Sequence, residues 1–389
     1  MTPEPSPTLH GAIRDELTGQ HDAVQVVEAA VADPDTLAHS WLITGPPGSG
    51  RSTLAYAFAG MLLAQGEADG GQRARAMVEA GTHPDLSILA TDRVLITMDE
   101  VRRLVAASQF SPSVARWRVI VIEDADRMAE RTSNVLLKAL EEPPPRTVWI
   151  LCAPSEADLL PTIRSRVRGL RLRVPAVEDV ARLLVERDGV EPRLADRAAR
   201  EAQSHIGMAL RLATDEEARR RRDRTVELAL GIRDAGGAAR AAAELLDIAK
   251  ADAEAYGAQV DEAERESLLR TLGIEPGGTV PPALRAQVRQ LEEDQKRRAT
   301  RSLRDGVDRI LVDLLSVGRD LVLAGLGVPD DLINRAAGPA VLAAAGTTSP
   351  AAALRALDAV ATARRRIDGN VPPLLALEAM LMSFRNPTR

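Results

Sequence analysis

The clearest chemical signal in the sequence is a glycine-rich stretch, WLITGPPGSGRSTLA, at residues 41–55. Gly45, Gly50 and Ser52 have the spacing of the phosphate-binding pattern G-x-x-x-x-G-K-[ST]. In that pattern the glycines let backbone N–H groups surround the phosphates at the positive end of a helix, and a lysine reaches the β- and γ-phosphates. Here Arg51 stands at the lysine position. Because arginine is a longer, planar cation, the stretch predicts a phosphate cradle whose chemistry is impaired.

A second signal is VIVIEDAD, at residues 119–126, which indicates a buried strand that ends in acids. Nucleotide hydrolases need such a pair of acids, of which the first holds the Mg²⁺ shell and the second activates the attacking water. The expected order is Asp-Glu, whereas this chain has Glu123-Asp124. Since aspartate is shorter than glutamate, we expect Asp124 to polarise a water poorly.

Together the two stretches predict a degenerate nucleotide site. Its expected residues are Gly45, Gly48, Gly50, Arg51, Ser52, Thr53, Glu123 and Asp124. Either stretch alone is weak evidence, because glycine-rich loops and acidic strand ends recur in unrelated proteins. Two plainer explanations therefore stay open, namely a Gly/Pro-rich turn that binds nothing and an ordinary acidic turn.

Composition favours a globular protein with more than one domain. The chain has 389 residues, of which 45% are hydrophobic and 27% charged, and its formal net charge of −6 argues against a polyanion-binding role for the whole molecule. Cys152 is the single cysteine, and the first residues lack a signal-peptide pattern, so we expect a cytoplasmic protein. Charges interrupt the most apolar late stretch, ILVDLLSVGRDLVLAGLGV, and no membrane role is indicated.

Hydrophobic patterning divides the chain into two parts. Short β-rich runs at 41–44, 119–122 and 147–153 alternate with helical patterns, which is typical of βαβ units with a covered parallel sheet. From about Pro175 the pattern is helical. The breaks expected in this helical part are DGVEP, the region near Gly207, and GIEPGGTVPP at 273–282, with later helices around 284–325, 350–366 and 372–385.

Six stretches follow one another in an order and spacing that resemble the bacterial clamp-loader AAA+ ATPases. They are GPPGSGRSTLA (45–55), AGTHPD (80–85), ITMDEVRRL (96–104), VIVIEDADRM (119–128), NVLLKALEEPPPRTVWIL (134–151) and LLPTIRSRV (159–167). NVLLKALEEPP is the most specific of them. In the helical tail, EEDQKRRATRSLRDGVDRILVDLL and NVPPLLALEAMLM resemble the collar domain of actinobacterial members.

The resemblance implies an α/β fold followed by an all-α region. It implies an AAA+ RecA-like parallel-sheet domain at 1–174, a small helical lid at 175–215 and a helical collar for oligomerisation at 216–389. It also implies a hetero-oligomer associated with the replisome, which opens a ring-shaped sliding clamp and loads it on primed DNA with ATP bound at subunit boundaries. The implied partners are the motor subunits (gamma/tau), the delta subunit, the sliding clamp and, through the complex, primed DNA.

The same resemblance assigns a role to the run Ser165-Arg166-Val167. In this family a serine-arginine-cysteine motif projects an arginine into the ATP site of the neighbouring subunit. Arg166 therefore matches a catalytic finger that acts in trans, with Ser165 beside it, and the valine in place of cysteine changes packing rather than charge. The plainer explanation is that Arg164, Arg166 and Arg168 form a solvated basic edge.

The chain departs from the motor subunits of this family at four positions of one pocket. They are Arg51, the inverted pair Glu123-Asp124, the dipeptide Ala153-Pro154 after the fourth strand, and Gly207 where the lid arginine aligns. We therefore expect weak or absent binding of ATP or ADP with Mg²⁺ and no efficient hydrolysis.

Cysteines are also missing where the family commonly carries a zinc module. The stretch before AGTHPD contains no cysteine, and His83 alone cannot build a four-ligand zinc site, so we predict no zinc. His83 is expected to cap or pack before Pro84. The arginines at 102, 103, 116 and 118 fit either a DNA channel or solvated positions, and they are not assigned as a site.

Three functions fit these observations. The leading hypothesis is a non-motor stator subunit of the clamp loader that lends Arg166 to an adjacent motor subunit. The alternative is a catalytically active AAA+ ATPase subunit in which Arg51 and Glu123 are tolerated substitutes. A P-loop small-molecule kinase ranks last, because the helical second half offers no substrate pocket and NVLLKALEEPPPRT has no role there.

Overall fold

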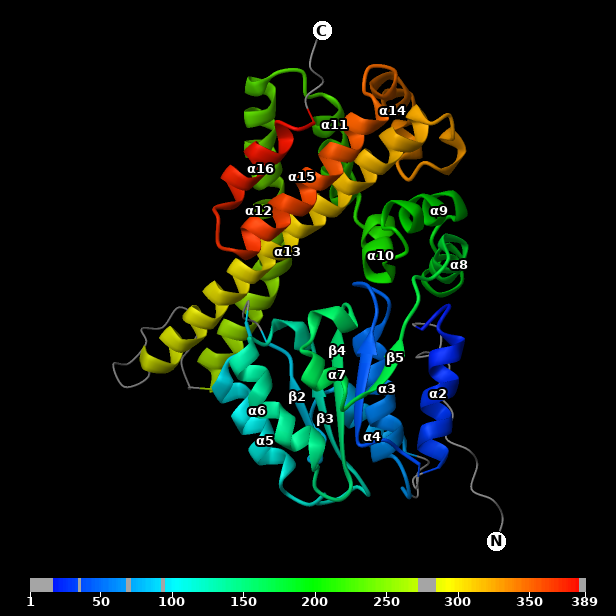
Figure 1. Ribbon diagram of the computed structural model, residues 1–389. Coiled ribbons are helices and arrows are strands. Elements are labelled where there is room, and N and C mark those ends of the chain that lie inside the picture. The colour runs from blue at the N-terminus through cyan, green and yellow to red at the C-terminus, as the bar shows by residue number, and fades with distance from the viewer. Residues whose placement is uncertain (1–16, 34–35, 68–70, 92–94, 272–284, 385–389) are drawn as a thin grey trace. The chain divides into compact units, whose positions relative to one another are not determined.

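The computed structural model describes residues 17–33, 36–67, 71–91, 95–271 and 285–384 (Figure 1). The chain forms two compact units, Met1–Arg211 and Leu212–Arg389. The first unit holds a parallel sheet with helices, and the second consists of helices. The predicted fold class, α/β followed by all-α, is thus confirmed.

The sheet of the first unit has five parallel strands in the order β2-β3-β4-β1-β5. The strands are β1 (Ser40–Thr44), β2 (Leu86–Leu89), β3 (Arg118–Ile122), β4 (Thr147–Ala153) and β5 (Arg168–Arg171). Every residue of β1, β3 and β4 is buried, as expected for strands covered on both faces. Because β1 lies between β4 and the edge strand β5, the loop that leaves it emerges next to the ends of these two strands.

Helices cover both faces of this sheet. They are α2 (His21–Ala32), α3 (Arg51–Leu63), α4 (Gln72–Glu79), α5 (Met98–Ser108), α6 (Glu130–Glu141) and α7 (Pro161–Arg164), with 3-10 turns η1 (Ala125–Arg127) and η2 (Glu156–Asp158). Successive residues of a strand point to opposite faces, so Trp41 packs edge-on against Phe58 of α3 while Leu42 joins Leu136 of α6. These two apolar layers fix the strand ends that carry the site.

Three short helices follow the sheet. They are α8 (Val177–Asp188), α9 (Pro192–Glu201) and α10 (Ile206–Thr214). The break predicted at DGVEP is confirmed, because α8 ends before Gly189, whose φ is 67°. The break predicted near Gly207 falls slightly earlier, since α10 begins at Ile206 and includes that glycine.

The second unit is helical. Its elements are α11 (Glu216–Leu230), α12 (Ala235–Thr271), α13 (Arg285–Gly325), η4 (Pro329–Asp331), η5 (Arg335–Ala337), α14 (Gly338–Ala345), α15 (Pro350–Asp368) and α16 (Pro373–Leu381). The late helices predicted from periodicity correspond to α13, α15 and α16. The stretch GIEPGGTVPP lies outside the described residues. Within the described ranges, no helix is both long and apolar enough to cross a membrane.

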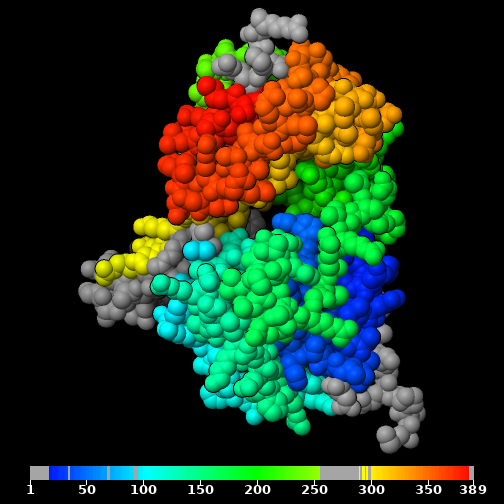
Figure 2. All heavy atoms as spheres, in the orientation of Figure 1, coloured from blue at the N-terminus to red at the C-terminus, as the bar shows by residue number. Residues whose placement is uncertain are grey.

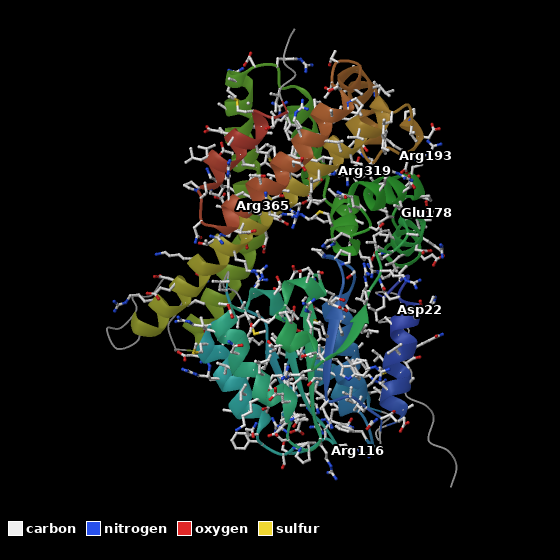
Figure 3. The ribbon with its side chains drawn as sticks, viewed as in Figure 1. Asp22, Arg116, Glu178, Arg193, Arg319 and Arg365 are labelled. Atoms are coloured by element: carbon white, nitrogen blue, oxygen red, sulfur yellow. The ribbon has the colours of Figure 1, made fainter. Side chains whose placement is uncertain are left out.

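A buried carboxylate fixes the loop that follows α13. Asp320 is fully buried and accepts hydrogen bonds from the backbone N–H groups of Ile333 (2.9 Å) and Asn334 (2.8 Å) and from the Asn334 side chain (2.9 Å). Arg319, labelled in Figure 3, pairs with Asp331 at 2.6 Å on the same loop. The loop is thereby held against α13 by charge-assisted hydrogen bonds.

Replacing Asp320 by asparagine should loosen this loop, because the amide cannot accept at both terminal atoms and leaves a buried donor unpaired. We expect the second unit to lose about 1–3 kcal/mol of stability. Hydrogen exchange of residues 330–337 should become faster. Asp330→Asn is the matched control, since Asp330 is exposed, and it should leave exchange unchanged. Equal protection in the two variants would contradict the assigned role.

Candidate nucleotide site and surface arginine

The loop after β1 has the backbone of a phosphate cradle. Gly48 and Gly50 adopt φ values of 77° and 90°, which glycine tolerates and other residues rarely adopt. Gly50 is the N-cap of α3, so the helix begins at Arg51 and directs its positive end at the loop. A Cβ added at Gly45 would lie 2.5 Å from the Ser49 hydroxyl oxygen, which explains why glycine is needed there too. The predicted strand–loop–helix geometry is therefore present.

The side chain at the lysine position turns back onto the loop. Nη1 of Arg51 donates to the carbonyl oxygen of Gly45 at 2.9 Å. The carbonyl oxygen of Gly45 thus binds the Arg51 guanidinium, which a γ-phosphate would need as its cation. Thr53, the last predicted residue of the loop, is half-buried in the first turn of α3.

The carboxylate at the magnesium position is already bound by two hydroxyls of α3. Ser52 Oγ donates to Glu123 Oε2 at 2.9 Å, and the Tyr56 hydroxyl donates to Glu123 Oε1. Burial and the hydrogen bond to Glu123 both raise the pKa of Tyr56 far above its usual range, so this phenol stays a donor. Sequence reasoning missed Tyr56, although its spacing of four residues from Ser52 places the two on one helix face.

The second acid is directed elsewhere. Asp124 has a left-handed backbone conformation, with φ at 49°, and serves as the N-cap residue of η1. Its carboxylate pairs with Nε of Arg127 at 3.4 Å. That Asp124 polarises a catalytic water poorly stays a prediction. The last residue of β4 is Ala153, whose methyl group offers no polar contact to a phosphate.

A histidine that the sequence analysis did not single out lies against the phosphate loop. A Cβ added at Gly48 would come within 2.2 Å of Cγ and 2.4 Å of Nδ1 of His205, so the imidazole rests directly on that glycine. Nδ1 of His205 accepts from the backbone N–H of Met208 at 3.2 Å, which orients the ring. Gly207, where a lid arginine was expected to align, carries no side chain to fill this role. The imidazole of His205 therefore covers the loop at Gly48.

A buried glutamine ties the loop from its other side. The Gln20 side chain donates to the carbonyl oxygens of Ser49 (3.3 Å) and Arg173 (2.7 Å) and accepts from the Arg173 N–H at 3.0 Å. These bonds connect the residue before α2, the loop and the segment after β5. The carbonyl oxygen of Ser49, in the cradle, is thus bound by a side chain from outside the loop.

Arg166 lies outside this pocket, on the surface. It follows α7 and is exposed, and its guanidinium pairs with Glu141, the last residue of α6. Figure 1 shows α6 and α7 next to each other, and in Figure 2 the cyan-to-green segment that contains them faces the viewer. Ser165 is exposed beside it and donates to the Thr162 carbonyl oxygen at 3.1 Å.

The histidine before β2 has a structural partner. His83 is buried, and its Nδ1 accepts from the backbone N–H of Asp85 at 3.1 Å. Burial lowers the pKa of His83, so the ring is neutral and keeps this lone pair for the hydrogen bond. The predicted capping role of His83 is confirmed. In the described ranges no group of three or more His, Cys, Asp or Glu could hold a metal ion, and the absence of zinc stays a prediction.

The strand order, the loop after β1 and the acids after β3 define the first unit as an AAA+-like P-loop domain. Residues 19–176 match the family model described as DNA polymerase III, delta subunit. This part of the chain, residues 19–176, is thus similar to the delta-type subunits of DNA polymerase III.

Two delta-prime subunits and one solved structure are similar to parts of this chain. The chain is 38% identical over 135 residues to the DNA polymerase III delta-prime subunit of Pseudomonas aeruginosa, covering 33% of this chain and 41% of the relative. It is 34% identical over 149 residues to the delta-prime subunit of Escherichia coli, covering 37% and 44%. The chain thus spans less than half the length of these two relatives. A gamma subunit-related structure from Thermotoga maritima aligns over 94% of this chain and 99% of its own, with 15% identity and a TM-score of 0.42.

Proposed function

We propose that this chain is a non-motor stator subunit of the replicative sliding-clamp loader, with no efficient ATPase activity of its own. It joins gamma/tau motor subunits and a delta subunit through its helical second unit, and it lends Arg166 to the ATP site of a neighbour. The complex then loads the sliding clamp onto primed DNA in the cytoplasm. The similarity of residues 19–176 to delta-type subunits of DNA polymerase III supports this role.

The observation that carries the proposal is the internal pairing of Glu123. Magnesium-bound ATP needs the hydroxyl of Ser52 and an acid after β3 as part of its metal shell. In this chain these two groups bind each other, and Tyr56 binds the same carboxylate. A nucleotide would also have to displace Arg51 from Gly45. These costs favour weak or absent nucleotide binding.

ATP hydrolysis assays with purified subunits distinguish a stator from a motor subunit. The isolated chain should hydrolyse ATP no faster than its Arg51→Ala variant, because neither has a competent metal site. Adding the chain to the motor and delta subunits should raise ATP turnover stimulated by clamp and primed DNA. A titration with a fluorescent ATP analogue measures binding directly. Turnover by the isolated chain at motor-subunit rates, abolished by Arg51→Ala, would establish the motor alternative instead.

A further inference from the structure

The guanidinium of Arg166 is engaged on both of its edges. Nε donates to Glu141 Oε1 at 2.5 Å, and Nη2 contacts the same carboxylate oxygen. On the opposite edge, Nη1 donates to the Thr162 carbonyl oxygen at 2.7 Å and to Ser165 Oγ at 2.9 Å. The contacts to Thr162 and Ser165 come from the turn that carries Arg166. Glu141 comes from a different element, at the end of α6.

The Nε and Nη2 atoms form the edge with which arginine binds carboxylates and phosphates, because two parallel N–H bonds match their oxygens. Glu141 occupies this edge, while the Nη1 contacts hold the side chain against its own turn. A phosphate oxygen from another subunit therefore cannot take the preferred edge of Arg166 until the Glu141 carboxylate has left.

We propose that Glu141 is an internal competitor of phosphate that holds Arg166 in a retracted position. This inference rests on the proposed function of Arg166. The pair is exposed to solvent, with 33% of the Arg166 side chain and 44% of the Glu141 side chain accessible, so it contributes little stability. A nucleotide phosphate carries more negative charge than a carboxylate and can displace it. Glu141 thus sets how readily the arginine is released, and it is a positioning residue.

Glu141→Gln keeps the size of the side chain and removes its charge. In the assembled complex we expect this variant to raise ATP turnover at subsaturating ATP by roughly 2- to 5-fold, the factor that an exposed ion pair represents. The gain should shrink as salt is added, because salt screens the wild-type pair. Glu142→Gln is the matched control. This variant removes the same charge at the next position of the chain. Glu142 and Arg166 both lie in the described part of the chain, and the structure records no ion pair between them.

The Arg166→Ala background tests whether the effect passes through the arginine. Glu141→Gln should change nothing there. Turnover that is unchanged or lower in the Glu141→Gln single variant would overturn the inference, and so would an equal gain in Glu142→Gln. If the complex with Arg166→Ala alone hydrolysed ATP at the wild-type rate, the proposed function of Arg166 itself would be wrong.

A second measurement needs no partner subunits. Phenylglyoxal modifies accessible guanidinium groups, and peptide mass spectrometry of the intact full-length chain after labelling reports the rate at Arg166. We expect roughly 2- to 5-fold faster modification of Arg166 in Glu141→Gln than in wild type or Glu142→Gln. Equal rates in all three proteins would show that Glu141 does not hold the guanidinium, whatever the complex does.

Discussion

Arg166→Ala should leave the protein folded and assembled but slow ATP hydrolysis at the neighbouring site by about 10³- to 10⁵-fold, the usual contribution of an arginine finger. The side chain is exposed and its partners are Glu141 and its own turn, so its removal disturbs no core. Single-turnover hydrolysis by the reconstituted complex is the direct measurement, because only the site beside this subunit should lose its fast phase. Clamp loading on primed DNA should fall with it.

Arg164→Ala is the control for this experiment. Arg164 is the exposed last residue of α7, two positions before Arg166, so the variant removes the same charge without touching the proposed finger. It should hydrolyse ATP and load clamps as the wild type does. If Arg164→Ala and Arg166→Ala lowered both rates equally, a solvated basic edge would explain them better. Unchanged rates in both variants would exclude Arg166 from catalysis.

The parts of the fold that were predictable are those encoded locally. Strands β1, β3 and β4 are buried throughout, so their apolar runs stand out in the sequence. The short strands β2 and β5 were not predicted. In β5 only Leu170 is buried, because this strand lies at an edge of the sheet, and Arg168 covers the ring of Trp41 at 4.8 Å. An edge strand of this kind lacks the apolar pattern that identifies a central one.

The candidate site was predictable in outline and not in its internal contacts. Glycine spacing gave the loop, because positive φ values require that residue at Gly48 and Gly50. The contact between the His205 imidazole and Gly48 connects residues far apart in the chain, so no local sequence pattern predicts it. The same holds for the pair of Arg166 with Glu141. The domain boundaries within 1–174, 175–215 and 216–389, the arginine finger and the actinobacterial type remain predictions.

Of the arginines at 102, 103, 116 and 118, which fit either a DNA channel or solvated positions by sequence, Arg118 has a structural role instead. Arg118 is buried and pairs with Asp85 at 3.2 Å. Asp85 is itself fully buried and accepts backbone N–H bonds from Ser113 (2.6 Å), Val114 (2.7 Å) and Ala115 (2.8 Å). The Asp85 carboxylate thus fixes the conformation of the loop that leads into β3. Such a group is expensive to remove, because its donors are left without an acceptor.

Asp85→Ala should therefore destabilise the first unit by about 3–5 kcal/mol, the cost of leaving one partner of a buried ion pair alone. The thiol of Cys152 reports on this unit alone, because it is buried in β4 and is the only cysteine. Burial raises its pKa to about 12, so the native thiol is inert and alkylation in rising urea follows unfolding. Asp99→Ala, which removes an exposed partner of Arg102, should shift stability by less than about 0.5 kcal/mol.

The same carboxylate predicts how the first unit responds to acid. Burial alone would raise the pKa of Asp85, but the backbone N–H bonds from Ala115, Ser113 and Val114 outweigh it and lower the pKa below its usual range. A lowered pKa in the folded state means that Asp85 stabilises the fold above its unfolded pKa of about 3.9 and that this stability is lost as the pH falls through the folded value. Urea unfolding between pH 7 and pH 3, followed by the fluorescence of Trp41, Trp117 and Trp149 in the first unit, should then show the wild type and Asp85→Asn converging in stability at the acid end. A constant gap between them across that range would mean that the charge on Asp85 does not hold the loop.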